Sequence, residues 1–357
     1  MKFVHIADMH FDAPFTSLNS KENLGEKRRL EQRNAFKKVI DFIEKNDIEY
    51  FFIAGDLYEQ DYVKKSTIDF ITKEFARIPN TKIFITPGNH DPYLKNSYYA
   101  THEFGENVFV FNSSNVEKYE DENVNIYGMA FTDFYMNSTE LESITVPFSN
   151  KLNILVAHCD LNGSKDENGF SYNPVLESKL NSLGFDYIAL GHVHKNNLDN
   201  KNRIYYPGST ISLGFDELGT HGMIAADMTK KSFKMEFVEL DDRRFEEIEI
   251  KVDDIYSKEE LAISIHADRI WLFNKINGNL RPLNIKDEEV NYKIAYSGTN
   301  ITLHKETGGS MLLISSMVRR LNPNTLTCSK ITIADGKNSS GNILIISPNV
   351  ASFSPFL

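Results

Sequence analysis

Short apolar runs alternate with amphipathic stretches through the first half of the chain. Three runs, at residues 3–7, 50–54 and 82–86, have the length and composition of buried strands. The stretches between them, residues 27–43 and 64–78, repeat apolar residues at the three- and four-residue spacing of a helix face. This order of strand, helix, strand, helix and strand predicts a parallel sheet with right-handed crossovers.

The alternation changes after residue 107. Residues 108–111 and 124–128 have strand patterns, and an acidic stretch at residues 117–122 lies between them without a helical pattern. Two strands joined by a polar connection of this kind are typical of a hairpin. We therefore predict that these two strands pair with each other.

Strand patterns continue through the middle of the chain, with one helical pattern near residues 175–183. Strands that first alternate with helices and later follow one another predict an α/β fold, in which two sheets pack face to face and helices cover the outside. The expected strands are residues 152–157, 187–190, 204–206, 223–227, 233–240 and 245–252.

A shift in composition at residues 253–260 predicts a domain boundary. We expect a first domain of residues 1–252 and a small second domain of residues 253–357, with a turn at Asn277 and Gly278. A chain of 357 residues is long enough for two hydrophobic cores. The stretch from Thr307 onward is rich in Ser, Asn and Gly, and no element is predicted there.

Charge and cysteine content narrow the function classes. The net charge of -11 argues against a protein that coats nucleic acid through bulk electrostatics, so a phosphate-bearing substrate needs a local source of attraction. Cys159 and Cys328 are too few for a disulfide framework. The opening residues lack the apolar region of a signal peptide, and no apolar run is long enough to span a bilayer. We therefore expect a cytoplasmic protein without membrane contact.

Residues of the types that commonly bind metals, Asp, Asn and His, lie at the ends of five predicted strands. In a parallel sheet such ends meet at one edge, where α/β folds place their sites. Two of the pairs, Asp8 with His10 and His192 with His194, are spaced by two residues, and residues two apart in an extended chain point to the same side. The candidate metal ligands are Asp8, His10, Asp56, Asn89, His158, His192 and His194.

Seven nitrogen and oxygen ligands exceed the four of a single zinc site. They suit two six-coordinate divalent cations that share one carboxylate and leave positions for water and substrate. Asp56, which can use both of its oxygens, is the expected bridge. Two cations and two carboxylates give the cluster a net charge of about +2, which attracts a phosphate although the chain as a whole is acidic.

Each of these short motifs on its own could equally belong to a turn or a helix cap. Their occurrence in order, each at the end of a predicted strand, is what favours a metal centre. Apart from His90, the other histidines have no such pattern, and we expect them to be structural or solvated. These are His5, His102, His221, His266 and His304.

The order Asp-X-His, Gly-Asp, Gly-Asn-His-Asp, His and Gly-His-X-His resembles the calcineurin-like metallophosphoesterase superfamily over roughly the first 210 residues. This resemblance implies a four-layer αββα sandwich and a site for two divalent metal ions, commonly manganese. By similarity, one ion takes Asp8, His10, Asp56 and His194. The other takes Asp56, Asn89, His158 and His192.

Further segments narrow the resemblance to the SbcD family of DNA repair exonucleases. Residues 206–209, Tyr-Pro-Gly-Ser, and the Phe-Asp-Glu of residues 215–217 are similar to the segment that follows Gly-His-X-His in that family. Residues 7–15 and 55–59 are similar to its YhaO-like bacterial branch. The resemblance implies DNA as substrate and a coiled-coil ATPase of the SbcC type as partner, and a homodimer is left open.

Two departures bear on what this resemblance implies. Glu59 stands three residues after Asp56, where archaeal and eukaryotic relatives have a second histidine and bacterial relatives often have an acid. The balance of exonuclease and endonuclease action is therefore left open. The stretch from Thr307 onward lacks the amphipathic helical pattern with which family members grip the ATPase, and this weakens the partner inference.

We interpret the chain as a two-metal phosphodiesterase that acts on DNA in repair, with residues 253–357 as an accessory domain that shapes access of the DNA. His90 is expected to donate a proton or to stabilise phosphate charge in the transition state, and Asp91 to orient its ring. Two alternatives stay open. One is a phosphatase or nucleotide phosphodiesterase of the same fold, and the other is a scaffold without activity that loads DNA for an ATPase.

No DNA-binding residue is assigned from the sequence. A basic cluster near the first predicted helix is more typical of a solvated helix face than of a DNA site. Phe11, Phe15 and Tyr58 lie close to predicted ligands and could line the cleft, with core packing as an equal alternative. The basic residues are Lys27, Arg28, Arg29, Arg33, Lys37 and Lys38.

Overall fold

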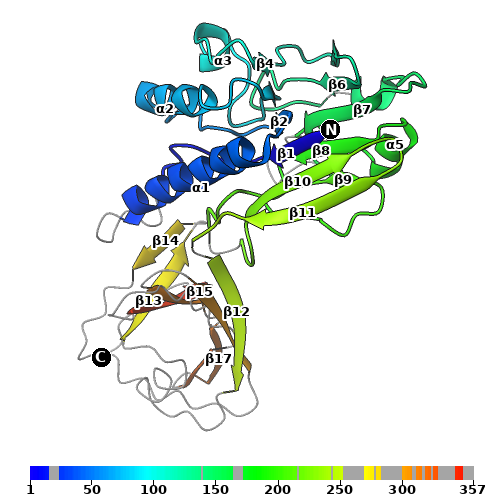
Figure 1. The fold of residues 1–357 in the computed structure, drawn as a ribbon. Helices are drawn as coiled ribbons and strands as arrows, with labels where there is room; N and C mark the ends of the chain where they lie inside the picture. The colour runs from blue at the N-terminus through cyan, green and yellow to red at the C-terminus, as the bar shows by residue number, and fades with distance from the viewer. Residues whose placement is uncertain are drawn as a thin grey trace. The chain divides into compact units, whose positions relative to one another are not determined.

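The chain forms two compact units (Figure 1). The first contains Met1–Pro14, Arg28–Ile211 and His221–Asp241, and the second is made mainly of strands after Asp242. The computed structural model describes residues 1–15, 24–137, 140–163, 172–214 and 217–242, followed by the strands β12 to β19 between residues 244 and 348.

Two mixed sheets form the centre of the first unit. One has the order β11-β10-β1-β2-β3-β4, in which β1 to β4 are parallel and β10 is antiparallel to β1. The other has the order β5-β6-β7-β8-β9, in which β6 to β9 are parallel. The strands are β1 Lys2–Ile6, β2 Tyr50–Ile53, β3 Lys82–Ile85, β4 Val108–Val110, β5 Glu117–Glu120, β6 Val124–Gly128, β7 Leu152–His158, β8 Tyr187–Gly191, β9 Ile204–Tyr205, β10 Gly222–Met228 and β11 Phe233–Glu239.

Helices cover the outer faces of both sheets, which makes the first unit the predicted αββα sandwich (Figure 1). α2 turns Ile68, Ile71 and Phe75 inward at helical spacing. Leu141 of α4 and Leu180 of α5 pack in one cluster with residues of β7 and β8. None of the described helices has the length and apolar content to cross a membrane. The helices are α1 Leu24–Asn46, α2 Lys65–Phe75, α3 Tyr98–Thr101, α4 Glu140–Ser143 and α5 Glu177–Ser182.

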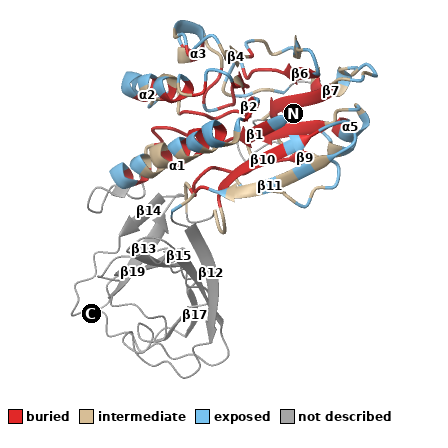
Figure 2. Cartoon of the chain, in the orientation of Figure 1, coloured by how far each residue is buried: buried red, intermediate tan, exposed pale blue. Residues whose placement is uncertain are grey.

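The main core lies between the two sheets. Phe3, Phe52 and Phe84 from the first sheet pack in one cluster with residues such as Ile154 and Ala189 from the second. β7 and β8 are buried along their whole length, as Figure 2 shows by colour. Parallel strands covered on both faces read as continuous apolar runs, which is why the sequence pattern predicts them well. This core fixes the strand ends that carry the predicted ligands.

The predicted hairpin between residues 108–111 and 124–128 is wrong. β4 pairs in parallel with β3 in the first sheet, whereas β6 pairs with β5 and β7 in the second. The chain changes sheets between them, and the acidic stretch forms the edge strand β5. Tyr119 of this strand packs its ring 5.0 Å from that of Phe84 and 4.7 Å from that of Phe109. Charged neighbours, which are common on edge strands, hid this single inward aromatic residue in the sequence pattern.

After residue 243, the described part of the second unit consists of strands. One sheet has the order β12-β15-β16-β19-β13-β14, and β17 pairs with β18. The predicted boundary at Asp253 lies outside the described residues. β12, which precedes it, pairs with β15 and therefore belongs to the sheet of the second unit. β13 and β14 pair antiparallel, and the predicted turn at Asn277 and Gly278 lies outside the described residues. The strands are β12 Arg244–Lys251, β13 Arg269–Ile276, β14 Asn279–Pro282, β15 Asn300–Thr307, β16 Met311–Ser315, β17 Val318–Asn322, β18 Thr325–Cys328 and β19 Asn342–Pro348.

Candidate metal centre

The predicted ligands lie at the carboxyl ends of strands from both sheets. Asp8 and Asp56 follow β1 and β2 of the first sheet, and His158 and His192 lie at the ends of β7 and β8 of the second. Two of the contacts that join the sheets here involve these histidines and the first sheet. Nδ1 of His158 lies 2.9 Å from the carbonyl oxygen of Ala54, and the amide of His192 donates to Oδ1 of Asp8 at 3.0 Å. The two rows of strand ends therefore meet at one site.

Four of the predicted ligands have left-handed backbone conformations. Asp8, His10 and Asp56 have φ angles of 52°, 48° and 52°, and His192 has 104°. Left-handed conformations of this kind cost non-glycine residues roughly 1–3 kcal/mol each, and they cluster at functional sites. The sequence argument assumed that Asp8 and His10 extend a strand, but β1 ends at Ile6. It is the left-handed turns that bring the two side chains together.

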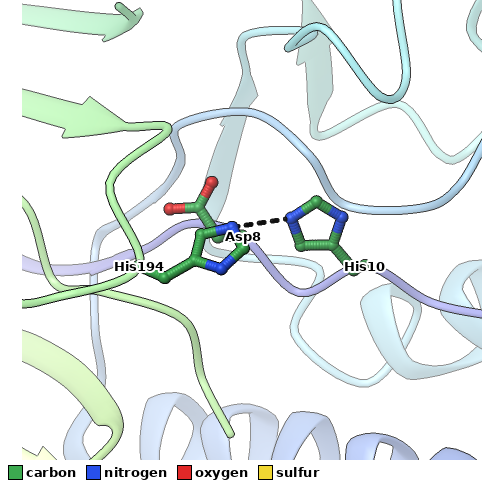
Figure 3. A group of neighbouring side chains, drawn as sticks. All are labelled: Asp8, His10 and His194. Carbon is green, nitrogen blue, oxygen red and sulfur yellow. Dashed lines mark hydrogen bonds between the residues drawn. The ribbon is translucent and has the colours of Figure 1, made fainter. Parts of the chain in front are cut away.

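Asp8, His10 and His194 form the first ligand group (Figure 3). Their ligand atoms lie within 4.8 Å of one another, and Nε2 of His10 is 3.1 Å from Nε2 of His194. Nδ1 of His10 is 2.8 Å from Oε1 of Glu59. Because a carboxylate accepts hydrogen bonds, we assign the ring proton of neutral His10 to Nδ1. Its Nε2 lone pair then points into the group, as a metal ligand requires.

Asn89, His158 and His192 form the second ligand group. Oδ1 of Asn89 lies 2.9 Å from Nε2 of His158 and 3.2 Å from Nδ1 of His192. Since the carbonyl of Ala54 takes the Nδ1 proton of His158, the Nε2 atom of a neutral His158 faces the amide oxygen as a second acceptor. Two buried acceptors in contact are unfavourable unless a proton or a cation lies between them.

Asp56 lies between the two groups. Its Oδ2 atom is 3.6 Å from Nε2 of His10 and 3.4 Å from Nε2 of His158. Its Oδ1 atom accepts the amide of His90 at 2.8 Å. One oxygen therefore faces a member of each group while the backbone holds the other, an arrangement that fits a bridging ligand.

The donor set fits two divalent cations. Imidazole nitrogens together with carboxylate and amide oxygens are ligands that manganese, iron and zinc all accept. Two pairs of acceptor atoms face each other at short distance, Nε2 of His10 with Nε2 of His194 and Oδ1 of Asn89 with Nε2 of His158. A site that binds cations has this arrangement. We propose that the first group with Asp56 holds one ion and that the second group with Asp56 holds the other.

Burial and charge shift the pKa values of the cluster in opposite directions. Burial raises the pKa of Asp8. Burial alone would also raise the pKa of Asp56, but His158 and His10 hold it well below its usual range. Burial lowers the pKa of His158, yet the charge and hydrogen bond of Asp56, together with Asp8 and the Ala54 carbonyl, raise it to about 9. The pKa of His192 is lowered by burial to about 3. The carboxylate between the groups therefore stays ionised, as a bridging ligand must.

Asp91 does not orient the ring of His90, and that prediction is wrong. Its carboxylate is fully buried, and both oxygens are already engaged in hydrogen bonds at 2.6–3.0 Å. Asp91 thereby ties the loop after β2 to the loop after β3. The donors are the amides of Asp56, Leu57 and Gly88 and the hydroxyl of Tyr99.

Glu59 orients His90 instead. Its Oε2 atom lies 2.9 Å from Nδ1 of His90, while its Oε1 atom contacts His10. Burial lowers the pKa of His90, but the hydrogen bond to Glu59 together with the negative charges of Asp56, Glu59 and Asp91 raises it to about 9. Burial would raise the pKa of Glu59, and the two histidines instead lower it to about 2. The sequence identified Glu59 only as a departure from relatives, and its spacing from Asp56 was the signal for this role.

His90 lies at the rim of the first group. Its side chain is 46% exposed, whereas those of His10 and Asp56 are 3% and 2% exposed. One of its ring nitrogens comes within 4.8 Å of a ligand atom of each of these two residues. Asn89, its neighbour in sequence, contacts the second group, so the two side chains diverge.

The other histidines that the structure describes have structural contacts, as expected. His5 is fully buried between the sheets, with ring nitrogens 3.1 Å from the hydroxyl of Tyr187 and 3.2 Å from the carbonyl of Leu190. His102 and His221 contact the hydroxyls of Thr72 and Ser209 at 2.8 and 2.9 Å. His266 lies outside the described residues, as does the side chain of His304.

Phe11 and Tyr58 are fully buried, which confirms core packing for both. Parts of the basic cluster also serve the fold. Arg28 is 3% exposed, and Arg33 donates to Thr67 at 2.7 Å and pairs with Asp12 at 3.3 Å. The prediction of a solvated helix face is therefore wrong for these two arginines, because the first helix packs them against acidic and hydroxyl groups of its own unit.

Comparison with known proteins identifies the family of the chain. The model of the calcineurin-like phosphoesterase family matches residues 1–196. The metallophosphoesterase YhaO of Bacillus subtilis (strain 168) is 25% identical over 262 residues, which cover 71% of this chain and 63% of the relative. SbcD, one of the subunits of the nuclease SbcCD of Staphylococcus epidermidis (strain ATCC 12228 / FDA PCI 1200), is 27% identical over 248 residues, which cover 61% of this chain and 63% of that protein. The match thus spans 63% of the length of each relative, and the chain belongs to the calcineurin-like phosphoesterase family.

Proposed function

We propose that the chain hydrolyses phosphodiester bonds of DNA, with two divalent metal ions held by the seven ligands. The observation that carries this proposal is the position of Asp56 Oδ2 between His10 and His158, at 3.6 and 3.4 Å. A shared carboxylate suits a pair of cations that clamps one phosphate. The similarity to a component of a nuclease supports DNA rather than a phosphomonoester as the substrate.

The residues around the ligands divide the work of hydrolysis. When bound, two cations supply Lewis acidity that activates water and offsets charge on the phosphate oxygens. His90, half exposed beside the first group, donates a proton to the leaving oxygen. Glu59 holds the His90 ring through Nδ1, so that Nε2 is the nitrogen available to the substrate. Asp91 keeps the loops that carry Asp56 and Asn89 in place.

We propose manganese as the native cation, because the mixture of imidazole, carboxylate and amide ligands accepts it and the family resemblance favours it. The protein purified with manganese should be assayed on linear duplex DNA, on single-stranded DNA and on a small phosphodiester. Shortening of DNA together with hydrolysis of the small ester is the expected result. Hydrolysis of phosphomonoesters or free nucleotides without any cleavage of DNA would replace the proposal with a phosphatase or a nucleotide phosphodiesterase. Binding of DNA without hydrolysis of any ester would favour a scaffold.

We further propose a role in DNA repair in the cytoplasm, with an SbcC-type ATPase as partner and the second unit as an accessory domain at the DNA. A protein truncated after Asp242 can test the role of the second unit. Because β12 pairs with β15, this truncation removes both strands together and leaves neither without its partner. This shortened protein should hydrolyse a small phosphodiester nearly as well as the full chain and lose most activity on duplex ends. Equal losses on both substrates would make the second unit part of the catalytic core.

A further inference from the structure

Ring contacts link two tyrosines to the second ligand group. The ring of Tyr172 stacks on that of His192, with centroids 5.0 Å apart and planes at 30°. The centroid of the Tyr135 ring lies 5.9 Å from that of Tyr172, with the planes tilted by 51°. Tyr135 is 45% exposed. Two ring contacts therefore link a predicted metal ligand to a partly exposed tyrosine of the first unit.

Backbone pairing, rather than burial, holds these rings in place. Met136 and Tyr172 form a parallel β-bridge, and the amide of Asn173 donates to the carbonyl of Met136 at 2.6 Å. On the other side, the amide of Asp160 donates to the carbonyl of Tyr172 at 3.1 Å. Asp160 follows His158 by two residues. The segments that carry the tyrosines are thus fixed to the end of β7.

Single exposed aromatic residues are common on protein surfaces and need no function. Phe148, for example, is fully exposed at the amino-terminal side of β7. Tyr135 differs because its ring makes a tilted contact with Tyr172, which in turn stacks on a ligand of the candidate metal centre. An aromatic ring linked in this way to the ligand group is positioned to contact a group next to a phosphate that the metal ions hold.

We propose that Tyr135 and Tyr172 form a stacking subsite for the nucleobase next to the scissile phosphate. This inference rests on the proposed function as a DNA phosphodiesterase. Every base presents a π face, so stacking tolerates any sequence and contributes roughly a 5- to 150-fold gain in affinity per base. Stacking also needs no positive surface, which suits a chain with a net charge of -11.

The test compares oligonucleotides that differ only in their terminal bases. One duplex carries normal terminal nucleotides, and the other carries abasic residues at both ends. With the full-length manganese protein, the KM on the abasic duplex should be roughly 5- to 150-fold higher than on the normal duplex. In Tyr135→Ala this ratio should fall toward one. Tyr135→Phe, which keeps the ring, and Phe148→Ala, which removes a distant exposed ring, should both keep the wild-type ratio.

A binding measurement provides a readout apart from turnover. The fluorescence of a terminal 2-aminopurine should be quenched on binding to the wild-type protein and to Tyr135→Phe, and much less on binding to Tyr135→Ala. Circular dichroism and metal content of the variant, both at wild-type values, show that the change is local.

The outcomes separate this inference from the function on which it rests. If the wild-type protein cleaves both duplexes with equal KM, or if Tyr135→Ala keeps the wild-type ratio and the quenching, the stacking subsite is wrong while the nuclease proposal stands. If the wild-type protein cleaves neither duplex but hydrolyses a small phosphodiester, the nuclease proposal itself is wrong, and the subsite with it.

Discussion

The two sides of the candidate metal centre are built differently. On the side of Asp8 and His10, the neighbours are charged, since Glu59 contacts the Nδ1 atoms of both His10 and His90. On the side of His158 and His192, the neighbours are a backbone carbonyl and two aromatic rings. Phe131 lies 5.5 Å from the ring of His158 at 86°, and Tyr172 stacks on His192.

This difference assigns different tasks to the two sides. A carboxylate between two histidines couples ligand orientation to charge, so the first side can both hold an ion and handle a proton. A carbonyl and packed rings orient His158 and His192 without adding charge. The second side therefore holds an ion, and the substrate beside it, in a fixed position. Asp56 belongs to both sides, and changes there should have the largest effect.

Substitution of Asp56 should remove the function of both sides at once. Asp56→Ala is expected to lose more metal than His10→Ala and to abolish hydrolysis of every phosphodiester, because Oδ2 faces both ligand groups. Metal content by mass spectrometry measures this. Asp56→Asn is the matched variant, since it can keep an oxygen for the amide of His90 while it removes the charge. An Asp56→Ala protein that still holds two ions would rule out the bridge.

Substitution of His90 should break the first side alone. His90→Asn is expected to bind two metal ions and DNA nearly normally, while kcat falls by about 10²- to 10⁴-fold, the usual cost of losing an acid or base. The loss should shrink on a small ester with an aryl leaving group, which needs little protonation. Loss of a metal ion in this variant would instead make His90 a ligand, which its distance from His10 and Asp56 permits.

Much of this arrangement could be read from the sequence, for a physical reason. Buried parallel strands are continuous apolar runs, and their carboxyl ends meet at one edge, so the polar residues after β1, β2, β3, β7 and β8 identify a shared site. The αββα architecture followed from the same runs. Where burial is one-sided the pattern failed, as in β5, whose single inward aromatic residue stands between charged neighbours.

The partners of the site residues were harder to predict. Asp91 adjoins His90 in sequence, yet the turn after β3 directs its carboxylate to backbone amides at 2.6–3.0 Å. Glu59 reaches His90 from a different strand end, across 31 positions of sequence. The stack of Tyr172 on His192 joins residues that share no motif. Contacts of this kind depend on tertiary structure, which residue spacing does not encode.

Substitution of Glu59 should weaken the first side without removing it. Glu59→Gln is expected to lower activity by about 10- to 100-fold, as loss of a group that orients ligands commonly does. One amide oxygen cannot accept from the Nδ1 atoms of both His10 and His90 as two carboxylate oxygens can. Glu44→Gln, which alters an exposed ion pair with Arg77, is the matched control and should keep full activity.

The pH profile of this variant gives a second readout. His90 must be protonated to act as an acid, and its protonated fraction falls as the pH rises through its pKa of about 9. Because the hydrogen bond to Glu59 raises that pKa, its loss should move the alkaline decline of kcat/KM to lower pH. An alkaline limb that stays in place would mean that Glu59 does not tune His90.

Substitution of Phe131 should have the smallest effect and should be confined to the second side. The edge-to-face contact with His158 is of the kind that contributes about 0.5–1.5 kcal/mol, so Phe131→Leu should weaken binding of one ion by roughly 2- to 12-fold. Phe75→Leu removes a buried ring that packs against Phe36 and Phe51, among the helices and the outer face of the first sheet, and should lower the unfolding temperature without changing metal affinity. Titration with manganese, followed by calorimetry, compares the two variants. Equal metal affinities in both would mean that the carbonyl of Ala54 alone fixes His158, and the second side would then owe its rigidity to the backbone rather than to its aromatic rings.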